Sequence, residues 1–154
     1  MTEIVTKISP RYDKVVKLLN SSGFFSTGVH GTEGGQPEGE EGETVASVAA
    51  KAEFGLGQPQ RSWLRAWFDE NKDEVMAQLN RQLQAAITNG ETYEWAMERV
   101  ALWVQADIQR RIRDGILPEN SPITIALKGS STPLIDSGLF RSSVVSYFNS
   151  QRVG

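Results

Sequence analysis

Two long stretches with apolar residues at helical spacing, separated only by Asn89 and Gly90, constrain the fold of this chain most. Residues 61–88 and residues 91–114 both place an apolar side chain every three to four positions, with one gap at Asn71. The stripes are Leu64, Phe68, Val75, Leu79, Leu83 and Ile87, then Tyr93, Met97, Val100, Val104, Ile108 and Ile112. Because the break is short, the pattern predicts an antiparallel helical hairpin that ends at Gly115.

Shorter segments with clear boundaries flank the hairpin. Before the hairpin we predict a helix that begins at Ser9-Pro10 and stops at residues 20–23, a strand at residues 24–29 and a helix at residues 44–54. After it we predict a short helix that follows Ser121-Pro122 and ends at Gly129, a helical turn capped by Asp136 or Ser137, and a strand at residues 143–148. The inward faces expected for the helices before the hairpin are Tyr12, Val15, Val16 and Leu19, then Val45, Val48, Ala49 and Ala52. The four tryptophans lie at or beside the hairpin stripes, so we expect them to pack in the core rather than to bind a cofactor.

Residues 31–43 form an acidic, glycine-rich run with the sequence GTEGGQPEGEEGE. It has no apolar residue to anchor it, which predicts a flexible acidic loop. The run could contact a basic partner, bind calcium or simply be solvated, but it lacks the regular ligand spacing of calcium loops. A solvated, self-repelling loop is therefore favoured over ligand binding, and a flexible loop that folds onto a neighbouring subunit is also compatible with the composition.

Composition limits the chemistry available to the chain. There is no cysteine and a single histidine, His30, so disulfides, thiolate chemistry and most transition-metal sites are excluded. The formal net charge of -3 gives no general attraction to nucleic acid or to an anionic membrane. No apolar run approaches the roughly 18 residues of a membrane span, and the first residues do not resemble a signal peptide. We therefore expect protein partners, no metal or other cofactor, and a cytoplasmic location during synthesis.

Two charged features invite a functional interpretation. Glu53 could be a general acid, but it has no second acid or base nearby in sequence, and a structural role, accepting backbone N–H groups or pairing with Arg61 or Arg65, is favoured. Arg110 and Arg113 share a helix face near the end of the second long helix. They could bind phosphate or a protein partner, or complement the helix dipole.

Three ordered motifs carry a family resemblance. Residues 45–55 read VASVAAKAEFG and residues 59–65 read PQRSWLR. The third motif consists of Pro118, Ser121, Pro122, Thr124, Lys128, Gly129, Pro133, Leu134, Ile135, Asp136, Gly138, Leu139 and Ser142. Together they resemble the tail-completion or neck proteins of long-tailed bacteriophages, with Trp63 where that family has phenylalanine and Ser137 where it has threonine.

The resemblance implies an α+β domain spanning residues 1–154, in which the two strands pair in a small antiparallel sheet that packs against a long antiparallel helical hairpin plus short helices. It implies a structural protein of the virion tail or neck, in a ring taken to be hexameric, which completes the tail and joins it to the head connector. Tail tube, tail terminator and head-connector proteins would be its partners, with DNA passing through the ring lumen. A tail-terminator or minor-tail role would give the same motifs.

Two alternatives are ranked below the structural role, and the sequence predicts no catalytic residue and no enzymatic activity. The chain could be a phage DNA-packaging or morphogenesis accessory protein. Residues 135–138, with the sequence Ile-Asp-Ser-Gly, also match the core of the aspartic-protease pattern, in which Asp136 would need a second aspartate from a symmetric dimer. The residues predicted to contact other subunits or partners are Glu38, Glu40, Glu41, Glu43, Arg110, Arg113, Lys128, Ser130, Ser131 and Thr132.

Overall fold

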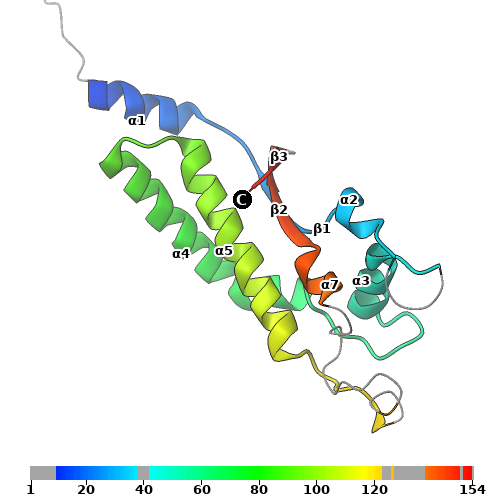
Figure 1. The fold of residues 1–154 in the computed structure, drawn as a ribbon. Coiled ribbons are helices and arrows are strands. Elements are labelled where there is room, and N and C mark those ends of the chain that lie inside the picture. The colour runs from blue at the N-terminus through cyan, green and yellow to red at the C-terminus, as the bar shows by residue number, and fades with distance from the viewer. Residues whose placement is uncertain (1–9, 38–41, 123–125, 127–137, 150, 154) are drawn as a thin grey trace, which may run out of the picture.

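The computed structural model describes residues 10–37, 42–122, 126, 138–149 and 151–153. Its elements in chain order are α1 (Pro10–Asn20), β1 (Phe25–Val29), α2 (Gly31–Gly34), α3 (Val45–Phe54), α4 (Arg65–Asn89), α5 (Tyr93–Asp114), α7 (Leu139–Ser142), β2 (Val144–Phe148) and β3 (Gln151–Arg152). Figure 1 shows the strands alongside α5, with α4 on one side of them and α2 and α3 on the other. The predicted α+β architecture is confirmed.

At its closed end the helical hairpin has boundaries within two residues of the predicted ones, since α4 ends at Asn89 and α5 begins at Tyr93. Helix α4 ends where Gly90 adopts a left-handed conformation with φ 74°, and α5 begins after Thr92, whose side chain accepts a hydrogen bond from the backbone N–H of Trp95. A left-handed residue after a helix suits glycine because glycine has no Cβ to clash. These two local signals reverse the chain between two helices of 25 and 22 residues.

The sheet joins the two halves of the chain. Strand β1 pairs antiparallel with β2, in a register that sets Phe25 opposite Phe148 and Val29 opposite Val144, and β3 adds two residues to the other edge of β2. The pairing implied by the family resemblance is confirmed. Ser146 is buried on β2, and its hydroxyl donates a hydrogen bond to the Ala101 carbonyl. Its backbone N–H donates to the side-chain oxygen of Gln105, so both polar groups have partners on α5. The middle strand is thereby fixed against α5.

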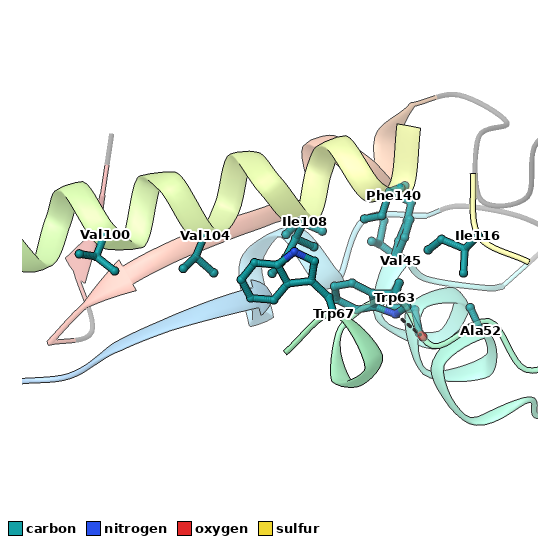
Figure 2. Close-up of a cluster of buried hydrophobic side chains, with 12 residues drawn as sticks. Val45, Ala52, Trp63, Trp67, Val100, Val104, Ile108, Ile116 and Phe140 are labelled. Carbon is teal, nitrogen blue, oxygen red and sulfur yellow. Dashed lines mark hydrogen bonds between the residues drawn. The ribbon is translucent and has the colours of Figure 1, made fainter. Parts of the chain in front are cut away.

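The main core lies between α5, the strands and the start of α4. Figure 2 shows Val100 and Val104 projecting from α5 toward the side on which Trp67 and Trp63 lie, with Phe140 and Val45 beside Trp63. Trp63 and Phe140 meet edge to face with ring centroids 5.2 Å apart. The predicted inner stripe of α5 is confirmed, because Met97, Val100, Val104, Ile108 and Ile112 are all buried. Trp63 and Trp67 are core residues, as expected.

Two predicted helix faces are partly wrong. On α4, Phe68 is 54% exposed and its neighbour Trp67 is buried, because the Trp67 indole N–H reaches Asp107 on α5. On α1, Tyr12 and Leu19 are exposed, and Leu18 is the buried residue, packed with Ala86 and Ala96. Helix α1 crosses the closed end of the hairpin (Figure 1), so only a narrow strip of its surface is covered.

The prediction of a loop over residues 31–43 is wrong at its start. Residues 31–34 form the single helical turn α2, in which the Gly34 N–H donates to the His30 carbonyl at 2.6 Å. Glu33 is buried, and the Tyr147 hydroxyl lies 3.5 Å from both of its carboxylate oxygens. Gly34 packs closely on Val29 and Ala46, so the turn is anchored without an apolar side chain of its own.

Several sequence predictions fall outside the described residues. They concern the short helix after Ser121-Pro122, of which only Pro122 and Ala126 are described, the turn at Asp136 and Ser137, and residues 38–41 of the acidic run. Within the described part of the chain, no helix is long and apolar enough to cross a membrane.

Candidate functional site

Glu53, at the end of α3, caps the N-terminus of α4 from a different helix. Its carboxylate accepts hydrogen bonds from the backbone N–H groups of Trp63 and Leu64, both at 3.0 Å, and from that of Arg65 at 3.3 Å. The Ser62 hydroxyl donates to it at 2.7 Å, and the Arg65 guanidinium lies 3.7 Å away. The first N–H groups of a helix have no partner within it and carry partial positive charge, so a buried carboxylate suits this position. The predicted structural role of Glu53 is confirmed, with Arg65 as its ion-pair partner.

Arg61 joins the same corner to the chain that leaves α5. Its side chain is buried and donates to the carbonyls of Pro118 at 2.7 Å and Glu119 at 3.2 Å. Its backbone N–H donates to the Ala52 carbonyl at 2.7 Å. Desolvation by burial lowers the pKa of the Arg61 guanidinium, which stays protonated near neutral pH.

These contacts bring the three motifs together; we call this cluster the motif junction and define it as Glu53, Arg61, Ser62, Trp63 and Pro118. The first motif supplies Glu53, the second supplies Arg61, Ser62 and Trp63, and the third begins at Pro118. The Trp63 indole N–H also donates to the Ala49 carbonyl at 3.1 Å, shown as a dashed line in Figure 2. The sequence pattern at these positions is therefore explained by contacts that hold α3, α4 and the end of α5 together.

The predicted interface residues are distributed over separate places. Glu43 pairs with Lys51 on α3, Arg110 pairs with Asp107, and Arg113 lies 2.9 Å from Asp114. The remaining candidates, Glu38, Glu40, Glu41, Lys128, Ser130, Ser131 and Thr132, lie outside the described residues, as does Asp136.

Arg110 and Arg113 do share a face, and the structure adds a third arginine to them. A hollow of about 420 Å³ is lined by residues of α5, α7 and β2, and we call it the arginine groove. Its lining residues are Gln105, Ala106, Gln109, Arg110, Arg113, Arg141, Ser142 and Val145. Sequence analysis missed Arg141, which α7 brings to α5 from a distant part of the chain. Arg111 points away, toward Glu70 on α4.

The wall of the arginine groove is held in place by two glutamines. The Gln109 side chain donates to the Val144 carbonyl at 2.8 Å, and the Gln105 side chain accepts from the Ser146 N–H at 2.7 Å. Both bonds tie α5 to the first residues of β2, which begins three residues after Arg141. The positions of the three arginine backbones are therefore fixed by the fold.

A second and larger hollow, of about 740 Å³, lies beside the motif junction. It is lined by residues of both charges, among them Arg65, Asp69, Arg111 and Asp114, together with Leu117. Exposed apolar side chains are present in the same part of the chain: Phe54, Leu56, Phe68 and Leu117. The Arg65 guanidinium lies 5.7 Å from the centre of the Phe54 ring.

The side chains that could hold a metal do not gather in the described part of the chain: no group of three or more histidine, cysteine, aspartate or glutamate residues was found there. Comparison with protein-family models, with curated proteins and with solved structures gave no match to this chain. The family resemblance therefore depends on the three sequence motifs themselves.

Proposed function

We propose that this chain is a structural protein of a bacteriophage tail or neck, which forms a ring that completes the tail and joins it to the head connector. The observation that supports this most is the motif junction. Residues that carry the resemblance, in three separate segments, contact one another through Glu53 and Arg61. The first two segments are neighbours in sequence, so the long-range contact that counts is the one from Arg61 to the Pro118 carbonyl, 57 residues away.

The surface of the described residues is also suited to contacts with other proteins. Large apolar side chains are exposed near the motif junction, and a groove with three arginines lies between α5, α7 and β2. Apolar and aromatic groups with arginine at their margin are enriched at protein interfaces. In this proposal, most of the surface contacts neighbouring copies of the chain and adjoining virion proteins.

The test is the assembly state of the purified protein, alone and with tails. We expect light scattering to give a mass several times that of the 17.0 kDa protomer, and electron microscopy to show closed rings on one end of the tail. Tails bearing the ring should join heads, and tails without it should not. A protein that stays monomeric and never binds tails would contradict the proposal.

The arginine groove also favours a second candidate, a DNA-packaging or morphogenesis accessory role. Three guanidinium groups on one surface could contact phosphates, which would make binding strongly salt-dependent. Titration with duplex DNA at low and moderate salt separates the two roles, because the accessory role requires measurable binding that Arg110→Glu abolishes. The protease alternative depends on Asp136, and loss of a peptidase activity in Asp136→Asn would be its test.

A further inference from the structure

We infer that the arginine groove receives the acidic segment, residues 38–43, of a second copy of this chain. The inference rests on the proposed function, which it deepens by naming a contact between adjacent subunits. Its basis is the chemistry of the groove, the charges of the acidic run, and the attachment of that run to the protomer.

The groove gathers positive charge without a carboxylate among its described lining residues. Arg110, Arg113 and Arg141 provide three guanidinium groups, and the remaining lining side chains are neutral. Arg110 and Arg113 each use one nitrogen in an ion pair within α5, and both side chains are more than half exposed. Exposed pairs of this kind contribute little stability, and each guanidinium has five N–H donors, so both can donate to a further carboxylate. The groove is therefore suited to an acidic peptide.

The acidic run has glutamates to match. Glu33 is buried beneath Tyr147, and Glu43 pairs with Lys51 within the same protomer. The sequence between them adds Glu38, Glu40 and Glu41, which lie outside the described residues. Three carboxylates within four consecutive positions correspond in number to the three guanidinium groups. Paired with arginine, carboxylates form charge-assisted and often bidentate hydrogen bonds.

The acidic segment and the groove belong to different elements of the protomer. An isolated antiparallel bridge between Pro37 and Thr44 pins the two ends of the acidic segment beside α3. From that bridge, three residues of extended chain reach roughly 10 Å. Figure 1 shows α2 and α3 at the far side of the strands from α5, whose residues form most of the groove. A contact between two different patches is heterologous, and such contacts close into a ring when the rotation permits.

Crosslinking tests the contact directly, because the chain has no natural cysteine. A Glu40→Cys copy mixed with a Ser142→Cys copy should yield a covalent heterodimer with a short bis-maleimide. The double variant should yield a ladder of linked protomers up to the ring size. Pairing Glu40→Cys with Gln84→Cys, an exposed position on α4, is the matched control and should yield little product. A double variant that links only within one chain would overturn the inference.

Charge exchange tests the chemistry. Arg113→Glu with Arg141→Glu should weaken self-association about 100-fold, and so should Glu38→Arg with Glu40→Arg, since like charges at an interface repel. Mixing the two variants should restore association at least tenfold. Arg81→Glu, which removes an exposed pair with Glu74 on α4, is the control and should leave association unchanged. Circular dichroism confirms that each variant is folded.

The outcomes separate this inference from the proposed function. Rings that survive the arginine reversals would overturn the inference and leave the ring proposal standing. Rings that survive while DNA binding is lost would assign the groove to phosphate instead. A wild-type chain that forms no ring, alone or on tails, would overturn both.

Discussion

At the scale of single residues, Glu53 shows how a structural carboxylate can look like a catalytic one. It is buried, it stands alone in the sequence, and it precedes an exposed phenylalanine. In the structure its two oxygens receive three backbone N–H groups and one hydroxyl. A carboxylate with this many donors is held in one position, which favours a structural role over proton transfer. Its role is to cap the N-terminus of α4.

Glu53→Ala should destabilise the protein by about 3 kcal/mol, because it removes a helix cap and leaves buried N–H groups without an acceptor. Urea denaturation followed by tryptophan fluorescence measures the loss. Glu94→Ala, on the exposed first turn of α5, is the matched control and should cost far less. Equal stability of the two variants would mean that water replaces the Glu53 carboxylate at no cost.

The Glu70–Arg111 pair between the two long helices gives a prediction about acid. A side-chain hydrogen bond from Arg111 lowers the pKa of Glu70 below its usual value, with some contribution from the Arg111 charge. A carboxyl group whose pKa is lower in the folded state stabilises the fold above its unfolded pKa. That contribution is lost as the pH falls through the lowered, folded value.

NMR titration of the Glu70 carboxyl group tests this cause. In Arg111→Gln the pKa of Glu70 should rise toward its ordinary value, and the stability of the variant should depend less on pH in the acid range. In Arg110→Gln the pKa of Glu70 should stay as in the wild type, since Arg110 pairs with Asp107. An unchanged Glu70 pKa in Arg111→Gln would exclude Arg111 as the cause.

At the scale of elements, local signals predicted most of the fold. Thr44, Gly55, Thr92 and Gly90 cap or end helices through contacts a few residues away, so the sequence revealed those boundaries. The start of α4 was predicted four residues early because its cap comes from Glu53, on another helix. Long-range contacts of this kind leave no periodic trace in the sequence.

The incorrect face of α4 and the incorrect loop at residues 31–34 have the same origin. Helical spacing alone allows either Trp67 or Phe68 to face the core, and the bond from Trp67 to Asp107, 2.7 Å long, belongs to tertiary structure. Glu33 is buried although its segment is acidic and glycine-rich, because Tyr147 on β2 covers it. In both cases a polar partner from a distant segment decides which residue is buried.

The turn between α1 and β1 gives a prediction about packing. A Cβ atom at Gly23 would lie 2.8 Å and 2.9 Å from two ring carbons of Phe148, which is buried on β2. Gly23→Ala should therefore displace that ring and cost about 2 kcal/mol through overpacking. The Phe148 ring resonances should shift in NMR spectra. Gly31→Ala, where a Cβ would meet nothing within 4 Å, should be neutral or slightly stabilising.

At the scale of the whole molecule, the candidate site was only half predictable. Arg110 and Arg113 lie one helical turn apart, so their shared face follows from spacing. Arg141 joins them only because β2 pairs with β1 and packs along α5, which places α7 beside the end of that helix. The motif junction was likewise invisible as a unit, although each of its three segments was noticed separately.

Arg61 connects the two ends of the hairpin, since it precedes α4 and binds the carbonyls that follow α5. Arg61→Gln should leave those carbonyls without their donors and free the chain at residues 118–122, with a loss of about 2 kcal/mol. Hydrogen–deuterium exchange should become faster in peptides from that segment while β2 stays protected. Arg65→Gln, which changes an exposed side chain next to Glu53, is the control and should leave exchange at residues 118–122 unaltered. If exchange there is equally slow in Arg61→Gln, then the open end of the hairpin is closed by other contacts, and the motif junction does not hold the third motif in place.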